Sequence, residues 1–428
     1  MSTDIDLVRR KRLIALGELQ ECNVGNSNSA VDKEDTQIPR EPAKGRKTKL
    51  TEKSAQAVID LCNTSDEESR TLQPARKKRV TESAVASCKG GANTDSTTLR
   101  SIQVLQSGQT PLAFQVASWN VWFGPPNDAN PHVTPRMREL VRLAVHGKRG
   151  QKEPYQAPWF IGLQEVTQES AIPLAESLKR AGYSTIITQE FEGGARMPYF
   201  CQLAVRHGSS NDPKLLESGS VGYTSTRMGR GFCYARVRLP GGNTHLSQEE
   251  QPQLLVATTH LESWAGKEYF GSIQRQEQLL EFENNCRSEF KLHAQLKWVI
   301  LMGDLNWDDE RKKGSPDSKM SAFLTLPWKD VWLDHLPSQQ DESTHFTYDG
   351  KLNPMLGNNM RRRFDRCLVF ARDHASLNQL ASQGVQLLGQ QTLPGLRFSK
   401  SNPWSNSKRE YPVAPSDHFG LIARLSFH

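Results

Sequence analysis

Acidic, amide and imidazole side chains recur where short apolar runs end. The run "LKWVILMGDLN" ends at Asp304 and Asn306, "AFQVASWN" ends at Asn120 and "PWFIGLQE" ends at Glu165. The run "QLLVATTHLE" ends at His260 and Glu262. Short, mostly apolar runs are typical of buried strands. Because each run ends in a side chain that can bind metal or transfer a proton, the pattern predicts strands that converge on one polar site.

These residue types suit hydrolysis of a phosphodiester. The reaction needs a cation near the phosphate oxygens, an acceptor for the proton of water and donors for the developing charge. Hard Mg²⁺ favours one or two carboxylates, so Glu165 is the best candidate ligand. Taken singly, Asp304 and Asn306 are ordinary turn formers, Glu165 an ordinary helix cap and His260 an ordinary core histidine. Their joint occurrence at strand ends favours a site.

The composition divides the chain of 428 residues into two parts. No aromatic residue precedes Phe114, and the polar first hundred residues predict a disordered N-terminal tail over 1–110. Residues 111–428 then form the catalytic domain. The net charge of +7 and the tail's basic clusters, Lys44–Lys49 and Ala75–Arg79, are compatible with nucleic acid as partner and with nuclear import, and also with solvated charge that binds nothing.

The tail also contains a short β-prone stretch with acidic residues after it. Val58, Ile59, Asp60 and Leu61 precede "SDEES", and together they resemble a SUMO-interacting motif. Such a strand can add to a sheet edge of a partner while the acids meet basic residues there. The resemblance implies SUMO or SUMOylated proteins as partners, and the alternative is an apolar segment without a partner.

Cysteine usage and hydropathy exclude several classes of protein. The seven cysteines are scattered and never in CxxC spacing, which disfavours a zinc site or a disulfide framework and favours a reducing compartment. No apolar run approaches the roughly 20 residues that span a bilayer. We therefore expect a soluble protein without a membrane partner.

Strand and helix patterns alternate irregularly after Phe114. Helices are expected over about 134–146, with Thr134 as N-cap and Pro135 in the first turn, and over about 170–181 and 272–291. Strands are expected over 115–119, 160–164, 185–188, 202–206, 232–238, 254–259, 298–302, 366–370 and 420–425. Many strands with interspersed helices predict an α+β sandwich.

Six motifs occur in the order found in the endonuclease/exonuclease/phosphatase superfamily, and the chain resembles that superfamily. They are "SWN" at 118–120, "LQEV" at 163–166, "THLES" at 259–263, "GDLN" at 303–306, "RFDR" at 363–366 and "SDHFGL" at 416–421. Within it, "MGRGF" at 228–232, "DVW" at 330–332 and "TYDGKLN" at 347–353 are similar to the tyrosyl-DNA phosphodiesterase 2 branch.

The resemblance implies a fold and an activity. The fold is a DNase I-like, four-layer sandwich of two packed mixed β-sheets flanked by helices. The activity is Mg²⁺-dependent hydrolysis, with Mn²⁺ as an alternative ion, of 5′-phosphotyrosyl-DNA linkages. Its substrates are DNA 5′ ends that carry topoisomerase 2 adducts, and its setting is DNA repair in the nucleus.

The family pattern also implies catalytic roles. Asp304 aligns the attacking water and accepts its proton, Asn120 and Asn306 donate to phosphate, and His260 and His418 stabilise five-coordinate phosphorus.

Metal binding is assigned to Glu165 and, as support, to Asp417. Neighbours in an extended segment point to opposite sides, so Asp417 is poorly placed to orient the ring of His418, and Asp365 is the expected partner of that ring.

The residues expected to bind substrate are Tyr199, Arg230, Ser263, Tyr348 and Phe364, with Arg362 as a further phosphate ligand. The three aromatic residues match groove positions of the tyrosyl-DNA enzymes, although core packing is the common role of an aromatic in a β-rich domain. A phenol has a pKa of about 10 and departs with little help from an acid, so a tyrosyl leaving group suits such a site.

Five residues depart from the family pattern. Trp122 stands where the family has an Asp, and Trp264 and Ala265 follow "HLES" where relatives have Thr-Arg. Trp307 and Asp308 follow Asn306 where relatives have Leu-Arg. The tryptophans either line a groove or pack under a lid. The departures keep two alternatives open: another phosphodiesterase of the superfamily, acting on RNA or abasic DNA, or an inactive adaptor that binds nucleic acid or SUMO.

Overall fold

The protein is described by a computed structural model of residues 112–122, 132–148, 155–190, 198–240, 247, 249–263, 271–308, 316–335, 346–356, 358–401 and 408–428. These residues all belong to one of the chain's two units, Leu99–His428. The predicted tail, with its basic clusters and SUMO-type motif, lies outside the described residues.

The first sheet has six strands in the order β13-β16-β1-β2-β4-β3. They span Leu380–Leu388, Gly420–Phe427, Leu112–Asn120, Phe160–Val166, Phe200–Val205 and Thr185–Thr188 in that order. The central pair β1 and β2 is parallel, and the other pairs are antiparallel.

The second sheet also has six strands, in the order β5-β6-β7-β8-β12-β9. They span Lys214–Gly222, Gly231–Arg238, Gln253–His260, Leu296–Asp304, Asp365–Ala371 and Trp328–Asp330. Here too the central pair, β7 and β8, is parallel while the others are antiparallel. Each sheet therefore sends the carboxyl ends of two neighbouring strands to the same edge.

The helices are α3 (Val133–His146), α4 (Gln168–Arg180), α5 (Ser272–Leu292) and the short α6 (His374–Gln379), with 3₁₀ segments η2 (Pro316–Phe323) and η3 (Leu333–His335). Two small antiparallel ribbons complete the fold: β10 (Tyr348–Asp349) with β11 (Arg361–Arg362), and β14 (Arg397–Ser401) with β15 (Lys408–Pro412). In the described part of the chain, no helix combines the length and apolar character needed to cross a membrane.

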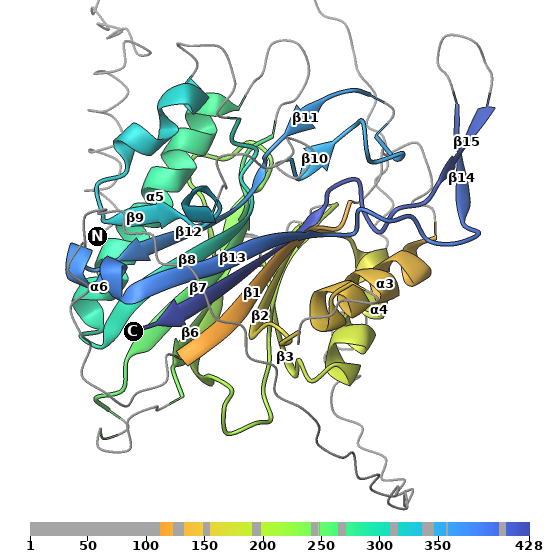
Figure 1. The fold of residues 1–428 in the computed structure, drawn as a ribbon. Helices are drawn as coiled ribbons and strands as arrows, with labels where there is room; N and C mark the ends of the chain where they lie inside the picture. The colour runs from red at the N-terminus through yellow and green to blue at the C-terminus, as the bar shows by residue number, and fades with distance from the viewer. Residues whose placement is uncertain are drawn as a thin grey trace, which may run out of the picture. The chain divides into compact units, whose positions relative to one another are not determined.

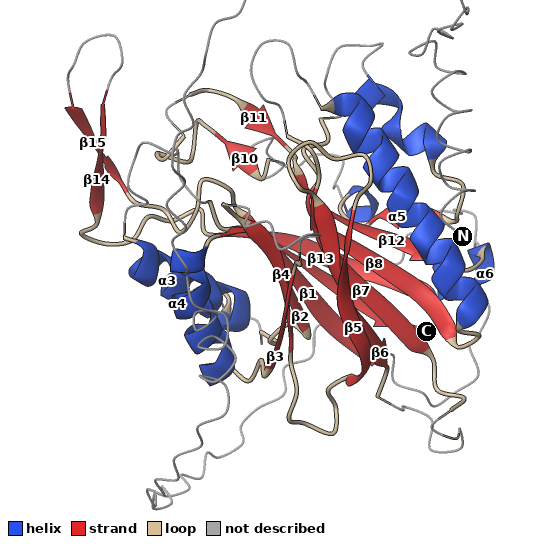
Figure 2. Cartoon of the chain, turned by 180° about the vertical axis from the view of Figure 1, so that it is seen from behind, coloured by secondary structure: helices blue, strands red, loops and turns tan. Residues whose placement is uncertain are grey.

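Three apolar clusters hold the layers together. Phe114, Val116 and Leu203 of the first sheet pack against Val256 and Ile300 of the second, between the two sheets. A second cluster joins the first sheet to α3 and α4, and a third joins the second sheet to α5 and η2. Figures 1 and 2 show α3 and α4 on one outer side and α5 on the other. The predicted four-layer sandwich is confirmed.

Helix starts differ slightly from the sequence predictions. Helix α3 begins at Val133 with His132 as N-cap, at a φ of 53°, so the prediction of Thr134 as cap is wrong. Pro135 is tolerated because the first-turn N–H groups have no intrahelical acceptor. Helix α4 begins at Gln168 because Thr167 and Ser170 form a capping box before it.

Two long strands, β5 and β13, are missing from the strands predicted from sequence. Most of their residues are half-buried or exposed, since both are edge strands. Polar residues are tolerated there, so neither strand carries the apolar run that identifies a central strand.

Candidate active site

The carboxyl ends of the two parallel strand pairs bring four of the predicted residues together. Asn120 ends β1, Glu165 is the penultimate residue of β2, His260 ends β7 and Asp304 ends β8. His260 and Asp304 are direct neighbours in the register of β7 and β8. The four runs noticed in the sequence therefore converge because each sheet keeps one parallel pair at its centre.

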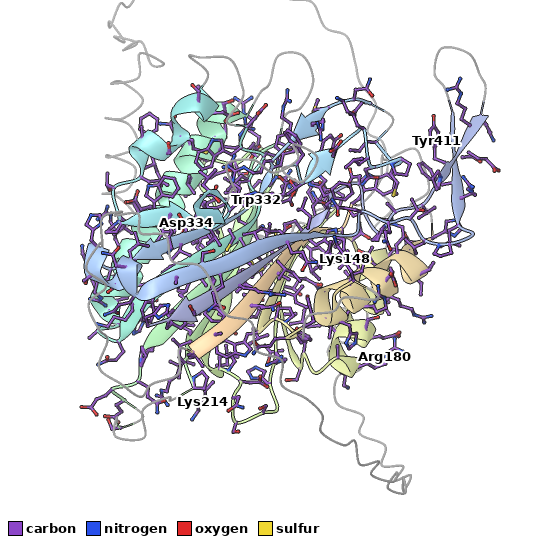
Figure 3. The ribbon with its side chains drawn as sticks, viewed as in Figure 1. Lys148, Arg180, Lys214, Trp332, Asp334 and Tyr411 are labelled. Atoms are coloured by element: carbon purple, nitrogen blue, oxygen red, sulfur yellow. The ribbon has the colours of Figure 1, made fainter. Side chains whose placement is uncertain are left out.

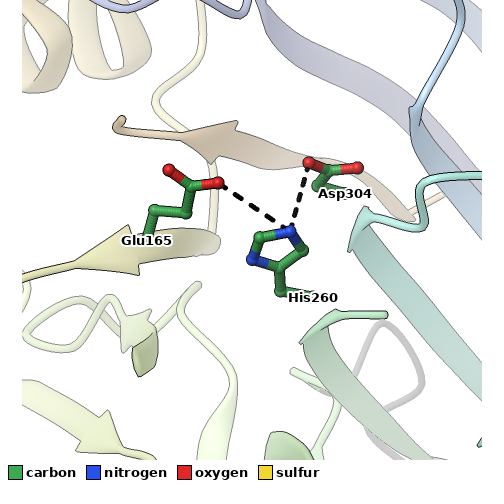
Figure 4. A group of neighbouring side chains, drawn as sticks. All are labelled: Glu165, His260 and Asp304. Atoms are coloured by element: carbon green, nitrogen blue, oxygen red, sulfur yellow. Dashed lines mark ion pairs between the residues drawn. The ribbon is translucent and has the colours of Figure 1, made fainter. Parts of the chain in front are cut away.

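Asp304 lies at the centre of this group. Its Oδ2 atom accepts a hydrogen bond of 3.0 Å from Asn120 Nδ2 and lies 3.5 Å from His260 Nε2 and 3.9 Å from His418 Nε2. The backbone N–H of Asn306 donates to its other oxygen at 2.9 Å. Figure 4 shows the carboxylates of Glu165 and Asp304 both directed toward the ring of His260. One carboxylate thus meets an amide and two imidazoles.

Glu165 adopts an unusual backbone conformation that turns its side chain toward the site. Its φ is 56°, and the pairing of β2 with β4 is irregular between Leu163 and Val166. Burial and the neighbouring Asp417 raise the pKa of Glu165 to about 7, against a hydrogen bond from Asn120 that lowers it. Burial likewise raises the pKa of Asp417. Gathered, desolvated carboxylates of this kind are stabilised by a cation.

The donor set fits a hard divalent ion. Oxygens of Glu165 and Asp304 and a nitrogen of His260 lie within 4.8 Å of one another. The nitrogen does not serve as a ligand, because Arg230 Nη1 lies 2.8 Å from His260 Nδ1 and Arg has only donors. Nδ1 must accept, and the proton of the neutral ring therefore sits on Nε2, which faces Glu165 and Asp304. The carboxylate of Glu165 remains as a ligand of the type that Mg²⁺ prefers, with the charge of Asp304 beside it.

The two imidazoles are held in opposite charge states. Burial and the guanidinium of Arg230 lower the pKa of His260 well below its usual value. Burial alone lowers the pKa of His418 as well, but Asp365 and Asp304 outweigh it, and the pKa of His418 is raised well above its usual value. The site therefore has a neutral N–H donor on one side of Asp304 and a charged one on the other.

Asp365 and His418 form the ring contact that the sequence predicted. Asp365 Oδ2 lies 2.8 Å from His418 Nδ1, and the carboxylate is fully buried. The indole of Trp119 donates to the carbonyl of His418 at 3.0 Å. A Cβ atom at Gly420 would lie 2.4 Å from the ring of Trp119, so glycine is required for this approach. These contacts fix where the ring of His418 lies.

The two asparagines differ from each other. Both N–H groups of Asn120 are directed at carboxylates, since its Nδ2 donates to Glu165 Oε1 and to Asp304 Oδ2, each at 3.0 Å. Asn120 therefore orients both carboxylates in this structure, and its role as a donor to phosphate stays a prediction. Asn306 has a φ of 47° and donates to the carbonyl of Leu261 at 3.1 Å, which leaves its second N–H group for another acceptor.

The three predicted aromatics surround the imidazoles. The ring of Tyr348 meets that of His418 edge-on at 5.1 Å and lies 5.6 Å from Phe364. The ring of Tyr199 lies 6.0 Å from that of His260. All three are half-buried, so they line the surroundings of the site and are not core residues.

The predicted substrate-binding basic and hydroxyl residues are engaged within the protein. Arg230 is 4% exposed and contacts His260, the Ser263 hydroxyl at 3.2 Å and the face of Tyr199 at 5.0 Å. It holds the ring of His260 in place. Arg362 Nε lies 2.7 Å from Asp308 Oδ2. Asp308, which departs from the family pattern, therefore neutralises the charge of Arg362, which the sequence predicted to bind phosphate.

The tryptophans take structural positions where they are described. Trp307 is 5% exposed, donates to the carbonyl of Asp317 at 2.9 Å and packs under the guanidinium of Arg366 at 4.2 Å. It belongs to the core, not to a stacking groove. Trp122 lies against Arg136 at 4.9 Å, and Trp264 lies outside the described residues.

The sequence prediction assigned no role to two supporting residues. Arg136 is fully buried and donates to the carbonyls of Pro415 and Val121. Burial lowers the pKa of Arg136 to about 10, although the negative charge of the nearby Asp417 opposes this shift. An arginine on the apolar stripe of a helix was the available signal. Glu262 is also buried and accepts from Arg227 N at 3.0 Å, which ties the loop before β6 to the end of β7.

Comparison with known proteins confirms the fold. D. rerio TDP2 (tyrosyl-DNA phosphodiesterase 2) complexed with single strand DNA product is 22% identical with a TM-score of 0.51, covering 73% of this chain and 98% of that chain. An endonuclease/exonuclease/phosphatase family protein from Bacteroides thetaiotaomicron is 15% identical with a TM-score of 0.50, covering 74% and 99%. No family model and no curated protein matches the chain. The fold that the sequence resemblance implied is therefore present.

Proposed function

We propose that this chain is a divalent-metal-dependent phosphodiesterase that hydrolyses 5′-phosphotyrosyl-DNA linkages and so releases topoisomerase 2 adducts from DNA 5′ ends during repair. The observation that carries the proposal is the position of Asp304, whose Oδ2 atom lies within 3.9 Å of an amide nitrogen and of two imidazole nitrogens. A proton acceptor and two N–H donors thus meet at one point, as in-line attack on phosphorus requires.

The roles of the residues follow from this geometry. Asp304 orients a water molecule and accepts its proton, because the carboxylate faces the site and is fixed by Asn120 and by the Asn306 backbone. The N–H groups of His260 and His418 donate to the phosphate oxygens as negative charge grows there. A buried site strengthens both interactions, since little water screens them.

Glu165 would hold the metal, with Asp417 and Asp304 adding negative charge around it. Bound Mg²⁺ supplies Lewis-acid stabilisation of the phosphate oxygens. The fit rests on the raised pKa of Glu165 and of Asp417, which marks carboxylates crowded together out of water. Mn²⁺ has similar ligand preferences and is expected to substitute.

The proposed substrate agrees with the surroundings of the site. A phenolate leaves with little acid assistance because the pKa of a phenol is about 10. Tyr348, Phe364 and Tyr199 present half-buried rings next to the two imidazoles. Base stacking on such rings contributes roughly 1 to 3 kcal/mol per base. The D. rerio TDP2 with the same fold was solved with single strand DNA product, which supports DNA as the ligand class.

The test is release of tyrosine from a 5′-phosphotyrosyl oligonucleotide by the full chain, in Mg²⁺, in Mn²⁺ and in EDTA. We expect metal-dependent release that falls at least about 100-fold in Asp304→Asn, since loss of a positioned proton acceptor typically costs a factor of about 10² to 10⁴. Asp334→Asn, at an exposed position of η3, is the matched control and should retain full activity.

A parallel panel of RNA and abasic DNA separates the alternatives. Turnover of RNA or abasic DNA without tyrosine release would show that the protein hydrolyses phosphodiesters but that the proposed phosphotyrosyl substrate is wrong. Absence of turnover on every substrate would refute the enzymatic proposal and favour an adaptor. The same proposal includes nuclear import through the basic tail clusters, which gives a nuclear location, and SUMO binding through Val58–Leu61. Deleting each segment tests the property assigned to it.

A further inference from the structure

The ribbon of β14 and β15 is a strongly basic element that the proposed mechanism does not use. Its two strands contain Arg397, Lys400, Lys408 and Arg409 against a single acid, Glu410, so ten residues have a formal charge of +3 in a chain whose total is +7. Figures 1 and 2 both show the ribbon projecting from the sandwich beyond α3. Charge is therefore concentrated on an outlying element.

The cations of the ribbon are open to solvent. Arg397, Lys408 and Arg409 are exposed, and in the part of the chain that the structure describes none of the three forms an ion pair. Arg362, by contrast, is paired with Asp308 close to the site. The ribbon thus presents exposed cations that a polyanion can contact.

Aromatic side chains accompany these charges. Phe398 and Tyr411 are cross-strand partners whose rings lie 5.6 Å apart at an angle of 35°. Both are half-buried, and Arg409 lies two residues before Tyr411, so it projects to the same face of the strand. Rings next to cations on one face are the combination that binds nucleic acid, the rings by stacking and the cations at phosphate.

The root of the ribbon is fixed directly to the site. Leu393 N donates to Val413 O at 2.7 Å, and Arg136 Nε donates to Pro415 O at 3.0 Å. The segment then continues through Ser416 and Asp417 to His418. At the other strand, His132 Nε2 lies 2.8 Å from the carbonyl of Arg397. A ligand held on the ribbon therefore has a defined position relative to His418.

We propose that the β14–β15 ribbon is a second nucleic-acid contact, which binds the phosphate backbone of the substrate beyond the reacting end. A strand of five residues spans about 17 Å at roughly 3.3 Å per residue. A nucleic acid strand of duplex presents about five phosphates over that length. The inference deepens the proposed function, and its ligand, a nucleic-acid backbone, can be tested by binding without turnover.

The experiment compares two double variants of the full chain. Lys400→Gln/Arg409→Gln removes one Lys and one Arg, which are cross-strand partners at alternate positions from Phe398 and Tyr411 on the same face of the ribbon. Arg180→Gln/Lys214→Gln removes the same charges from exposed positions on α4 and β5. Figure 3 shows Arg180 and Lys214 on parts of the molecule away from Tyr411 of the ribbon. Fluorescence anisotropy measures the affinity for 5′-phosphorylated oligonucleotides of 12 nucleotides, single-stranded and duplex, at several salt concentrations.

We expect the ribbon variant to bind about 25- to 60-fold more weakly at 0.1 M salt, because each lost phosphate contact removes about 0.7 to 0.9 from the slope of log K against log salt. The slope should flatten by about 1.4 on single strands or 1.8 on duplex, and the more affected probe identifies the form that the ribbon binds. Turnover of a single-nucleotide p-nitrophenyl phosphodiester, which is too short to reach the ribbon, should not change.

A loss of less than threefold relative to the control variant on both probes would overturn the inference, as would an equal loss in the two variants. Equal thermal unfolding of the variants and the parent excludes misfolding as the cause. If the ribbon variant binds more weakly than the control variant but the parent protein releases no tyrosine, the ribbon contact stands and the proposed substrate is wrong. The two proposals therefore fail separately.

Discussion

Replacing His418 by Phe is expected to destabilise the fold through the carboxylate it leaves behind. Asp365 is fully buried, and its Oδ2 atom lies 2.8 Å from His418 Nδ1. Its other oxygen has no hydrogen-bond partner among the described residues. His418 is therefore the main neutralising partner of this carboxylate, and a phenyl ring keeps the volume while removing the charge.

The magnitude follows from protonation of the orphaned group. A buried carboxylate without a counterion takes up a proton, and an ordinary carboxyl with a pKa of about 3.9 resists this by about 4 kcal/mol at pH 7, at about 1.4 kcal/mol per pH unit. This agrees with the roughly 3 to 5 kcal/mol for breaking a buried ion pair. The folded variant then holds a proton that the unfolded chain releases, which lowers its deficit by about 2.7 kcal/mol between pH 7 and pH 5. The parent gains about 0.8 kcal/mol over the same range, because its unfolded chain takes up a proton on His418 that the folded protein already holds. The deficit therefore shrinks as the pH falls, to about 2.3 kcal/mol at pH 5.

The assay is urea unfolding of His418→Phe, Asp365→Leu and the double variant at pH 7 and pH 5. The double variant replaces the pair by apolar groups of similar volume and should recover at least about 2 kcal/mol of the loss in His418→Phe. His146→Phe, at an exposed position of α3, is the control and should change stability by less than about 0.5 kcal/mol. A loss below about 1 kcal/mol at pH 7, or the same loss at both pH values, would refute the reasoning.

Two further predictions concern single residues near the site. Gly303→Ala should destabilise the protein by about 3 kcal/mol or more in urea unfolding, because Gly303 has a φ of 149° and a Cβ there would lie 1.9 Å from Thr259 O. A loss below about 1 kcal/mol would contradict the close approach of β7 and β8. Asp308→Asn removes the charge that neutralises Arg362 in their 2.7 Å ion pair and should strengthen DNA binding about fivefold at 0.1 M salt in anisotropy, the equivalent of one phosphate contact. An unchanged or weaker affinity would show that Arg362 does not face the ligand.

The central strands and the long helices were predictable because burial marks their sequences. Strands β1, β2, β7 and β8 are almost fully buried and contain the apolar runs that the sequence shows. The same criterion missed β5 and β13, whose residues are mostly half-buried or exposed. Edge strands are specified by pairing with a neighbour, and one chain segment read alone carries no record of that pairing.

The site was predictable as a set of residues but not as an arrangement. Asn120, Glu165, His260 and Asp304 stand out because each follows an apolar run. Asn120 faces two carboxylates, and Arg230 is buried behind His260 instead of open to phosphate. Both positions depend on contacts between elements that are far apart in the chain. Side chains of the same type bind a ligand or support a neighbour according to what lies within about 3 Å of them.

The amino-acid sequence alone determined which strands are buried and which side chains end them, because transfer of apolar residues out of water is a property of each residue and its near neighbours. Tertiary structure decided the parallel pairing of β1 with β2 and of β7 with β8, and with it the meeting of Asp304 with both imidazoles. It also set the opposite charge states of His260 and His418, since a pKa responds to burial and to charges only a few ångströms away, which folding alone brings together.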